Sequence, residues 1–252
     1  MLDLMRKLTF FSTLLLTLLL AGQRISAQDF SNKGKDFWVG YGYHQVMNAG
    51  NQQQMVLYFV TDTATSTTVT VSIPGIGYTQ TYTNIPANTA FTSNPIPKTA
   101  GQDARLTAES TAPENKGIHI TADHPVVAYA HIYNASVSGA SILFPTNVLG
   151  KEYYSINYTN ISNSGNANCW FYVVACDTGR TTVEITPSAA TINHPAGVPF
   201  TISLLQGQVY NVMGQFNNTT LKGVDLTGSK IQSISSANGS CKKIGVFSGS
   251  GR

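Results

Sequence analysis

Residues 169–187 read "CWFYVVACDTGRTTVEITP", two apolar and β-branched runs on either side of a polar turn that contains a glycine. Runs of this length and composition, bounded by turn residues, are typical of β-strands. Short runs of the same kind recur along most of the chain. Beyond residue 27, no eleven-residue stretch has the apolar spacing of a helix together with its caps. The sequence therefore predicts an all-β fold.

The stretch has a counterpart about 115 residues earlier in the chain, "MVLYFVTDTATSTTVTVSIP" at 55–74. Three further pairs follow the same order: "DFWVGYGY" (36–43) with "EYYSINY" (152–158), "IPANTAFTSN" (85–94) with "LLQGQVYNVMG" (204–214), and 116–133 with 229–250. We infer a tandem duplication, with a first β repeat at 28–133 and a second at 134–252. The junction is expected near 134–150. Each repeat is expected to be a β-sandwich-like unit of about seven strands, and propeller-like blades are the alternative.

Three of the five histidines, His119, His124 and His131, fall in "KGIHITADHPVVAYAHIY" at 116–133. In both copies this segment is predicted to form a β-hairpin, with "ADHP" as the turn in the first copy and "SSANGSCKK" in the second. The second copy has no histidine, so the imidazoles are interpreted as parts of the scaffold. No convergent ligand set suggests a metal site, and no cofactor is expected.

The sequence lacks the motifs of common catalytic sites. It has no G-x-S-x-G elbow, no phosphate-binding loop and no dinucleotide fingerprint. Its carboxylates lie far apart in the chain, with no pair at a recognisable glycosidase spacing. They include Asp103, Glu109, Glu114, Glu152 and Asp225. We therefore expect a protein that is not an enzyme, with a secreted hydrolase as a less favoured alternative.

The first 27 residues have the pattern of a secretory signal peptide. Arg6 and Lys7 precede an apolar run from Leu8 to Gly22, and small residues follow up to a cleavage site near Ala27. The run is shorter than the roughly 20 apolar residues of a membrane span, so no membrane insertion is expected after cleavage. Cleavage removes three basic residues and one acidic residue, which lowers the net charge from +3 to +1. A charge so close to zero gives no reason to expect nucleic acid as a partner.

Three cysteines, Cys169, Cys176 and Cys241, fit an oxidising compartment but leave one unpaired. If 169–176 is a single strand, its ends lie about 23 Å apart, far beyond the roughly 7 Å that a disulfide allows between Cα atoms. Any disulfide within the chain is therefore expected to use Cys241. Cys176 is the expected partner because it ends its strand beside a turn.

Most aromatic side chains fall on predicted strands and are assigned to the core. They are Trp38, Tyr41, Tyr43, Tyr58, Phe59, Trp170, Phe171 and Tyr172. The alternative for some tyrosines is an exposed recognition surface made of Tyr41, Tyr43, Tyr78 and Tyr82.

Several segments together resemble the N-terminal domain of IgGFc-binding proteins, in the version of large secreted or surface proteins of gliding-type Gram-negative bacteria. These segments are "GKDFWVGY", "DHPVVAYAHIY", "LFPTNVLGKEYYSINY", "VVACDTGRTTVEITP", "DLTGSKIQS" and "CKKIGVFSGSG". The resemblance spans roughly residues 34–252 and brings no catalytic residues with it. In such relatives a further segment like "LFPTNVLGKEYY" begins another unit. Here the chain stops at Arg252, and it is expected to be the front part of a longer protein.

The function expected from these observations is an extracellular module for binding or adhesion, secreted or held at the cell surface. Its partner is expected to be a glycoprotein or a glycan, with immunoglobulin among the candidates. A structural spacer in a long surface protein is the main alternative. Loops at the same end of the two repeats differ, "YHQVMNAGNQQQ" at 43–54 and "TNISNSGNAN" at 159–168, as in recognition on a rigid frame. The predicted contacts are Tyr43, His44, Gln45, Gln52, Gln53 and Gln54.

Overall fold

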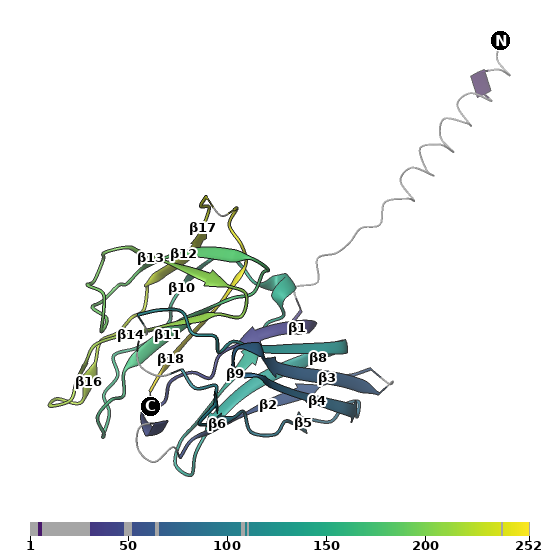
Figure 1. Cartoon of the computed structure of the whole chain (residues 1–252), viewed down its shortest axis with the longest axis horizontal. Helices are drawn as coiled ribbons and strands as arrows, with labels where there is room; N and C mark the ends of the chain where they lie inside the picture. The colour runs from purple at the N-terminus through teal and green to yellow at the C-terminus, as the bar shows by residue number, and fades with distance from the viewer. Residues whose placement is uncertain are drawn as a thin grey trace. The chain divides into compact units, whose positions relative to one another are not determined.

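The computed structural model describes residues 5–6, 31–47, 52–63, 66–106, 109, 111–237 and 239–251. Residues Ser31–Arg252 form one compact unit. In the described part of this unit the regular structure is β-strand, apart from the short 3-10 turns η1 (Gln45–Met47), η2 (Pro74–Ile76) and η3 (Thr146–Val148). The all-β prediction is confirmed (Figure 1). The predicted signal peptide, residues 1–27, lies outside the described residues except for Met5 and Arg6.

The first half of the unit is a seven-stranded antiparallel sheet built around one long strand, β8 (Ile118–Tyr133). The other strands of this sheet are β1 (Lys33–Val39), β2 (Gln54–Val60), β3 (Thr67–Ile73), β4 (Tyr78–Ile85), β5 (Phe91–Thr92) and β9 (Ser138–Leu143). A separate short pair is formed by β6 (Lys98–Thr99) and β7 (Gln102–Asp103).

β8 is continuous over 16 residues, so the hairpin predicted at 116–133 is wrong. Its first part pairs with β1 and β3, and its second part pairs with β2 and β9. The register against β1 jumps from Gly34↔Val126 to Asp36↔Thr121, so the "ADHP" segment forms a bulge. Proline has no N–H to give to a ladder and is tolerated at such a bulge. The polar segment therefore bends one strand instead of turning the chain back.

The second half is a sandwich of two antiparallel sheets. One has the order β10 (Glu152–Tyr154), β17 (Lys230–Ile234), β12 (Arg180–Thr186), β13 (Phe200–Leu205). The other, called here the middle sheet, has the order β14 (Val209–Met213), β11 (Cys169–Ala175), β18 (Ile244–Ser250). β15 (Phe216–Asn217) and β16 (Lys222–Gly223) form a separate short pair. Because β17 and β18 lie in different sheets, the hairpin predicted at 229–250 is also wrong.

Strand pairing follows the same order in both halves. The first half pairs β4-β3-β8-β1 and β5-β2-β8, and the second pairs β13-β12-β17-β10 and β14-β11-β18. β8 thus corresponds to β17 in the first order and to β18 in the second. Asn88 and Gly207 stand at matching turns, with φ of 55° and 77°. On this agreement we propose the tandem duplication. β9 follows residue 134 and belongs to the first sheet, so we place the boundary after β9, within the junction expected near 134–150.

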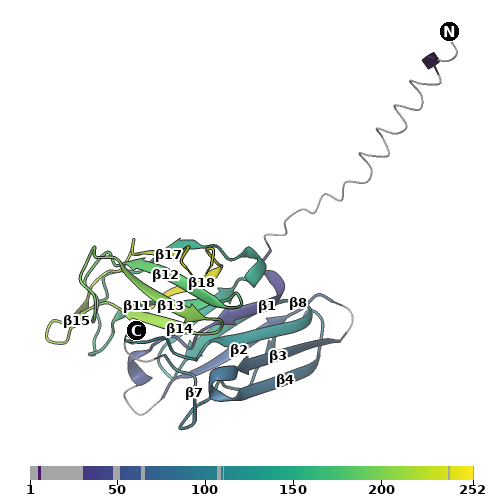
Figure 2. The same ribbon diagram turned by 45° about the horizontal axis from the view of Figure 1, so that its top comes forward.

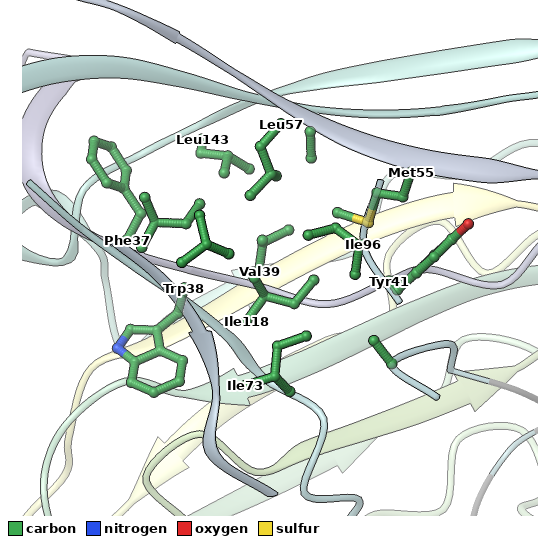
Figure 3. Close-up of a cluster of buried hydrophobic side chains, with 14 of the residues drawn as sticks. Phe37, Trp38, Val39, Tyr41, Met55, Leu57, Ile73, Ile96, Ile118 and Leu143 are labelled. Carbon is green, nitrogen blue, oxygen red and sulfur yellow. The ribbon is translucent and has the colours of Figure 1, made fainter. Parts of the chain in front are cut away.

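The middle sheet is covered on both faces, and all seven residues of β11 are buried. Trp170, Tyr172 and Val174 belong to one hydrophobic core, together with inner residues of the first sheet that include Leu57 and Ile118 (Figure 3). The alternate side chains of β11 belong to a second core inside the sandwich: Cys169, Phe171, Val173 and Ala175. Figure 2 shows β12 and β17, then β11 and β14, then β1 and β8, in that order. The sheets are stacked layers, not the blades of a propeller.

The aromatic residues assigned to the core are buried, except for the half-buried Tyr58: Trp38, Tyr41, Tyr43, Phe59, Trp170, Phe171 and Tyr172. Tyr172 also holds the layers together through its hydroxyl group. The Tyr172 hydroxyl donates to the Gly40 carbonyl oxygen (3.1 Å) and accepts from the Gly40 N–H (3.0 Å). Tyr41, Tyr43 and Tyr82 are no more than 8% exposed, so these tyrosines do not form an exposed recognition surface.

His119 lies in a small polar cluster on the first sheet. Its Nε2 is 2.8 Å from Asp36 Oδ2, and its ring stacks on Trp38 with centroids 4.0 Å apart. The Thr146 hydroxyl also bonds to Asp36. The hydrogen bond from His119, followed by that from Thr146, holds the pKa of Asp36 below its ordinary value, although partial burial opposes this. In the second half Lys230 and Glu152 form an ion pair at the matching position (3.3 Å). His119 therefore has a structural partner.

All three cysteines are free, so the predicted Cys176–Cys241 disulfide is not formed. Cys176 is buried with its thiol directed at the Val174 carbonyl oxygen (3.6 Å). Cys241 lies in the loop after β17, with its sulfur 3.4 Å from the Ser235 hydroxyl. The prediction that 169–176 is one strand is correct except for its last residue, because β11 spans Cys169–Ala175.

Replacing Tyr172 by phenylalanine is expected to lower the free energy of unfolding by about 1–3 kcal/mol, because the buried N–H and carbonyl of Gly40 both lose their partner. Urea unfolding followed by circular dichroism measures the change. Tyr58→Phe is the matched control, since Tyr58 has the corresponding position on β2 and is half exposed. Equal losses in the two variants would contradict the assigned role of the Tyr172 hydroxyl.

The Asp36→Asn variant is expected to be less stable than wild type at pH 7. The depressed pKa of Asp36 gives the fold a contribution that is present above the ordinary value of 3.8 and is lost as the pH falls through the lower folded-state value. The stability difference between wild type and variant should therefore shrink on acidification below that ordinary value. Urea unfolding at a series of pH values tests this, and a difference that does not change with pH would show that the carboxylate is not held in this way.

Candidate binding pocket

A pocket of about 250 Å³ lies between the first sheet and the middle sheet. Its lining comes from residues 39, 40 and 42–44 at the end of β1 and after it, residues 137–141 at β9, and residues 247–250 of β18. Trp170 and Tyr172 of β11 contribute to it, and so does Tyr158. No Asp, Glu, Lys or Arg is among the described residues that line it. The pocket is therefore apolar and aromatic, with hydroxyl groups from serines at its edges.

Trp170 is fixed in this pocket by two glycines. A Cβ atom on Gly42 would lie 2.6 Å from the indole ring, and one on Gly249 would lie 2.4 Å from it. Both distances are too short for any side chain, so glycine is required for the backbones to approach the ring so closely. Trp170 is only 8% exposed, and its indole N–H has no acceptor among the described residues. A buried donor without a partner is costly, unless a ligand or water supplies an oxygen.

The other aromatic rings continue from Trp170 as a row. Trp170 stacks near Tyr172 with centroids 5.6 Å apart, and Tyr172 stacks near Phe247 at 4.9 Å. Burial raises the pKa of Tyr172 well above its ordinary value, so its phenol stays protonated and serves as the hydrogen-bonding group described above. Tyr158 is 53% exposed. The pocket thus offers one ring that a ligand reaches from solvent, Tyr158, in addition to the stacked row of Trp170, Tyr172 and Phe247.

The predicted contact residues divide into two groups. Tyr43 and His44 line the pocket. Tyr43 is buried, and its hydroxyl donates to the Asn166 carbonyl oxygen (2.9 Å). The four glutamines lie outside the pocket lining: Gln45 and Gln53 are buried, whereas Gln52 and Gln54 are exposed. Residues 48–51 of the same loop lie outside the described residues.

Trp170, Phe247 and Gly249 are pocket residues that sequence reasoning did not single out as a site. Trp170 was assigned to the core, and its 8% exposure agrees with that. The signal that could have revealed the pocket is the alternation of glycine with small residues in "FSGSG" at 247–251, opposite an aromatic strand. Glycines facing a tryptophan mark a place where two backbones approach one ring.

The strongest arrangement of acid and base groups lies elsewhere, around Glu109. Its fully buried carboxylate accepts hydrogen bonds from the Met213 N–H (3.2 Å) and the Thr191 hydroxyl (3.3 Å), and His194 Nε2 lies 3.5 Å away. Burial raises the pKa of Glu109, and it lowers the pKa of His194. The Glu109 carboxylate has no exposed surface, so a substrate cannot reach it. The cluster instead joins the segment after β7 to the second half.

Other groups with catalytic or metal-binding chemistry are not assembled into a site. Burial raises the pKa of the Cys176 thiol to about 12, which leaves it protonated and a poor nucleophile at neutral pH. The described residues contain no cluster of three or more His, Cys, Asp or Glu side chains placed to hold a metal ion. His131 bonds instead to the Tyr58 hydroxyl (3.0 Å), and His124 to the neighbouring Asp123 (3.1 Å).

Comparison with known proteins gives one result. Residues 139–251 match the family model described as IgGFc binding protein. No significant match to a curated protein or to a solved structure was found. Among the described residues, none of the helices has the length and apolar character needed to span a membrane.

The matched region begins in β9 and ends after β18, and it covers the second half of the resemblance expected over residues 34–252. It contains Tyr158, Trp170 and Phe247 of the pocket. The match to the IgGFc binding protein model over residues 139–251 agrees with the resemblance that the sequence predicted for this part of the chain.

Proposed function

We propose that the protein is an extracellular binding module, without a catalytic role, that recognises a glycoprotein or a glycan through the aromatic pocket. The family match supports a module of the binding type. The observation that carries the proposal is an uncharged pocket lined by aromatic rings, one of which, Tyr158, is 53% exposed, and by serine hydroxyl groups. Binding sites commonly combine an apolar lining with a few fixed polar groups of this kind.

A sugar ring fits this combination because it has an apolar face of C–H groups and a rim of hydroxyl groups. The exposed ring of Tyr158 can stack on the apolar face. Ser138, Ser141 and Ser248 offer further hydroxyl groups in the lining. The absence of charged side chains among the described lining residues favours a neutral ligand.

The predicted contact loop adds to the pocket at one end. Tyr43 and His44 are part of the lining, while Gln52 and Gln54 are exposed further along the loop. We propose that these glutamines contact the protein part of a glycoprotein, for which immunoglobulin is a candidate through the family description. Export through the signal peptide at 1–27 would bring the module to such partners.

Removing the exposed ring is the sharpest test. The Tyr158→Ala variant is expected to bind about tenfold more weakly, equivalent to about 1.4 kcal/mol, to any glycan or glycoprotein that the wild type captures on an array that includes immunoglobulin G. Tyr154→Ala is the matched control, because Tyr154 is 58% exposed but does not line the pocket.

Both variants should keep the melting temperature of the wild type, since both rings are largely exposed. If the wild type captures nothing, or if Tyr158→Ala binds as well as Tyr154→Ala, the pocket is not the recognition site. The first of these results would favour the structural spacer over the binding module.

A further inference from the structure

Large apolar side chains are exposed along a short segment that begins in β10. Tyr154 is 58% exposed, Ile156 is 79% exposed and Tyr158 is 53% exposed, whereas Ser155 between them is buried. These three alternate residues, called here the 154–158 strip, therefore point to the same side of the chain. An exposed row of large apolar side chains is characteristic of an interaction surface.

The corresponding row in the first half is covered. The residues of β10 correspond to those of β1. The side chain of Glu152 contacts that of Lys230 at the place where the side chain of Asp36 contacts that of His119. By this register the 154–158 strip corresponds to the alternate residues Trp38, Gly40 and Gly42. That row lies against the outer face of the middle sheet.

Three contacts show how the covered row is held. Gly40 shares two hydrogen bonds with the Tyr172 hydroxyl. Gly42 approaches Trp170 so closely that a Cβ atom would lie 2.6 Å from the ring. Trp38 covers Gly207 in the turn between β13 and β14, where a Cβ atom would lie 3.0 Å from the indole. Within the molecule, the row of Trp38, Gly40 and Gly42 thus packs against the face of the middle sheet.

The first sheet presents a second face of the same kind, which no described element covers to the same degree. Tyr58 pairs with Tyr129 across β2 and β8, as Tyr172 pairs with Phe247 across β11 and β18. Val56 pairs with His131 in the same way, and it stands where Trp170 stands in the middle sheet. Tyr58, Tyr129 and His131 are half exposed, and this face of β2 and β8 carries no Asp, Glu, Lys or Arg.

The sizes of the side chains are reversed between the two places. In the internal contact a glycine of the row, Gly42, faces the large ring of Trp170. At the corresponding place outside the molecule the row has the large Tyr158. The sheet has the smaller Val56, which is only 4% exposed, beside the half-buried Tyr58 and His131, so the docked row would meet these two rings.

We propose that the 154–158 strip of one molecule docks on the outer face of β2 and β8 of a second copy of the chain. The contact repeats between molecules the packing that already joins the two halves within one molecule. Because the two surfaces differ, the association is head to tail, and each added molecule presents a fresh surface of each kind. The protein then forms chains of increasing length as its concentration rises.

Analytical ultracentrifugation of the protein from about 1 µM to about 500 µM tests the proposal over the range of weak interfaces. The wild type is expected to show a weight-average mass that rises with concentration. Ile156→Lys is expected to weaken the association at least tenfold, because a charged group would have to be buried in an apolar contact. Val198→Lys is the matched control, since Val198 is 51% exposed and lies outside the strip.

A mixing experiment separates head-to-tail association from other arrangements. The Tyr129→Lys variant blocks the face of β2 and β8. The Thr92→Lys variant blocks the same face from an exposed position opposite Tyr58, and it leaves the half-buried rings unchanged. Each of these variants alone should be monomeric. An equimolar mixture of Ile156→Lys with either one should form dimers and nothing longer, because one intact strip and one intact face remain.

Three results would overturn the proposal. They are a wild type that stays monomeric over the whole range, an Ile156→Lys variant that associates like the wild type, and a mixture that contains only monomers. Tyr158 belongs to both the pocket and the strip, whereas Ile156 does not line the pocket. The Ile156→Lys variant therefore separates failure of this contact from failure of ligand recognition, since it should still bind any ligand of the wild type.

Discussion

Burial of β11 on both faces is the constraint on which the rest of the structure depends. Trp170 and Tyr172 belong to the core shared with the first sheet, while Phe171 and Val173 belong to the core of the sandwich. Separating the halves would expose one face of this strand to water, at a cost that grows with the apolar area uncovered. The sheets therefore fall into two groups by hydrogen bonding, yet residues Ser31–Arg252 form one compact unit.

Local sequence patterns predicted the strands well. The features that these patterns missed depend on pairing between segments far apart in the chain. The run "CWFYVVA" is a single strand because its length and composition suit one, but a uniformly apolar run does not say what covers each face. "ADHP" has the composition of a turn, yet β8 continues through it because β1 pairs with β8 on both sides of this segment. Tyr43 and His44 were predicted as contacts, whereas Trp170 and Gly249 meet only through the fold. Counting cysteines likewise could not show that Cys176 and Cys241 face different neighbours.

The two ion pairs, Asp36 with His119 and Glu152 with Lys230, show that one geometry can be kept with different chemistry. In each half the acidic residue lies on the edge strand and the basic partner lies on the adjacent central strand. The first pair joins a carboxylate to an imidazole, and the second joins a carboxylate to an ammonium group. The two halves therefore keep the same contact with different side chains.

The chain contains two tryptophans, and the fold gives each a different neighbour. Trp38 stacks on the ring of His119, so its emission is sensitive to the contact between β1 and β8. Trp170 lines the pocket between the first sheet and the middle sheet, so its emission is sensitive to the surroundings of that pocket. The protein thus carries two built-in optical reporters, one inside the first sheet and one between the layers. Replacing either tryptophan would leave the other as a single label-free probe.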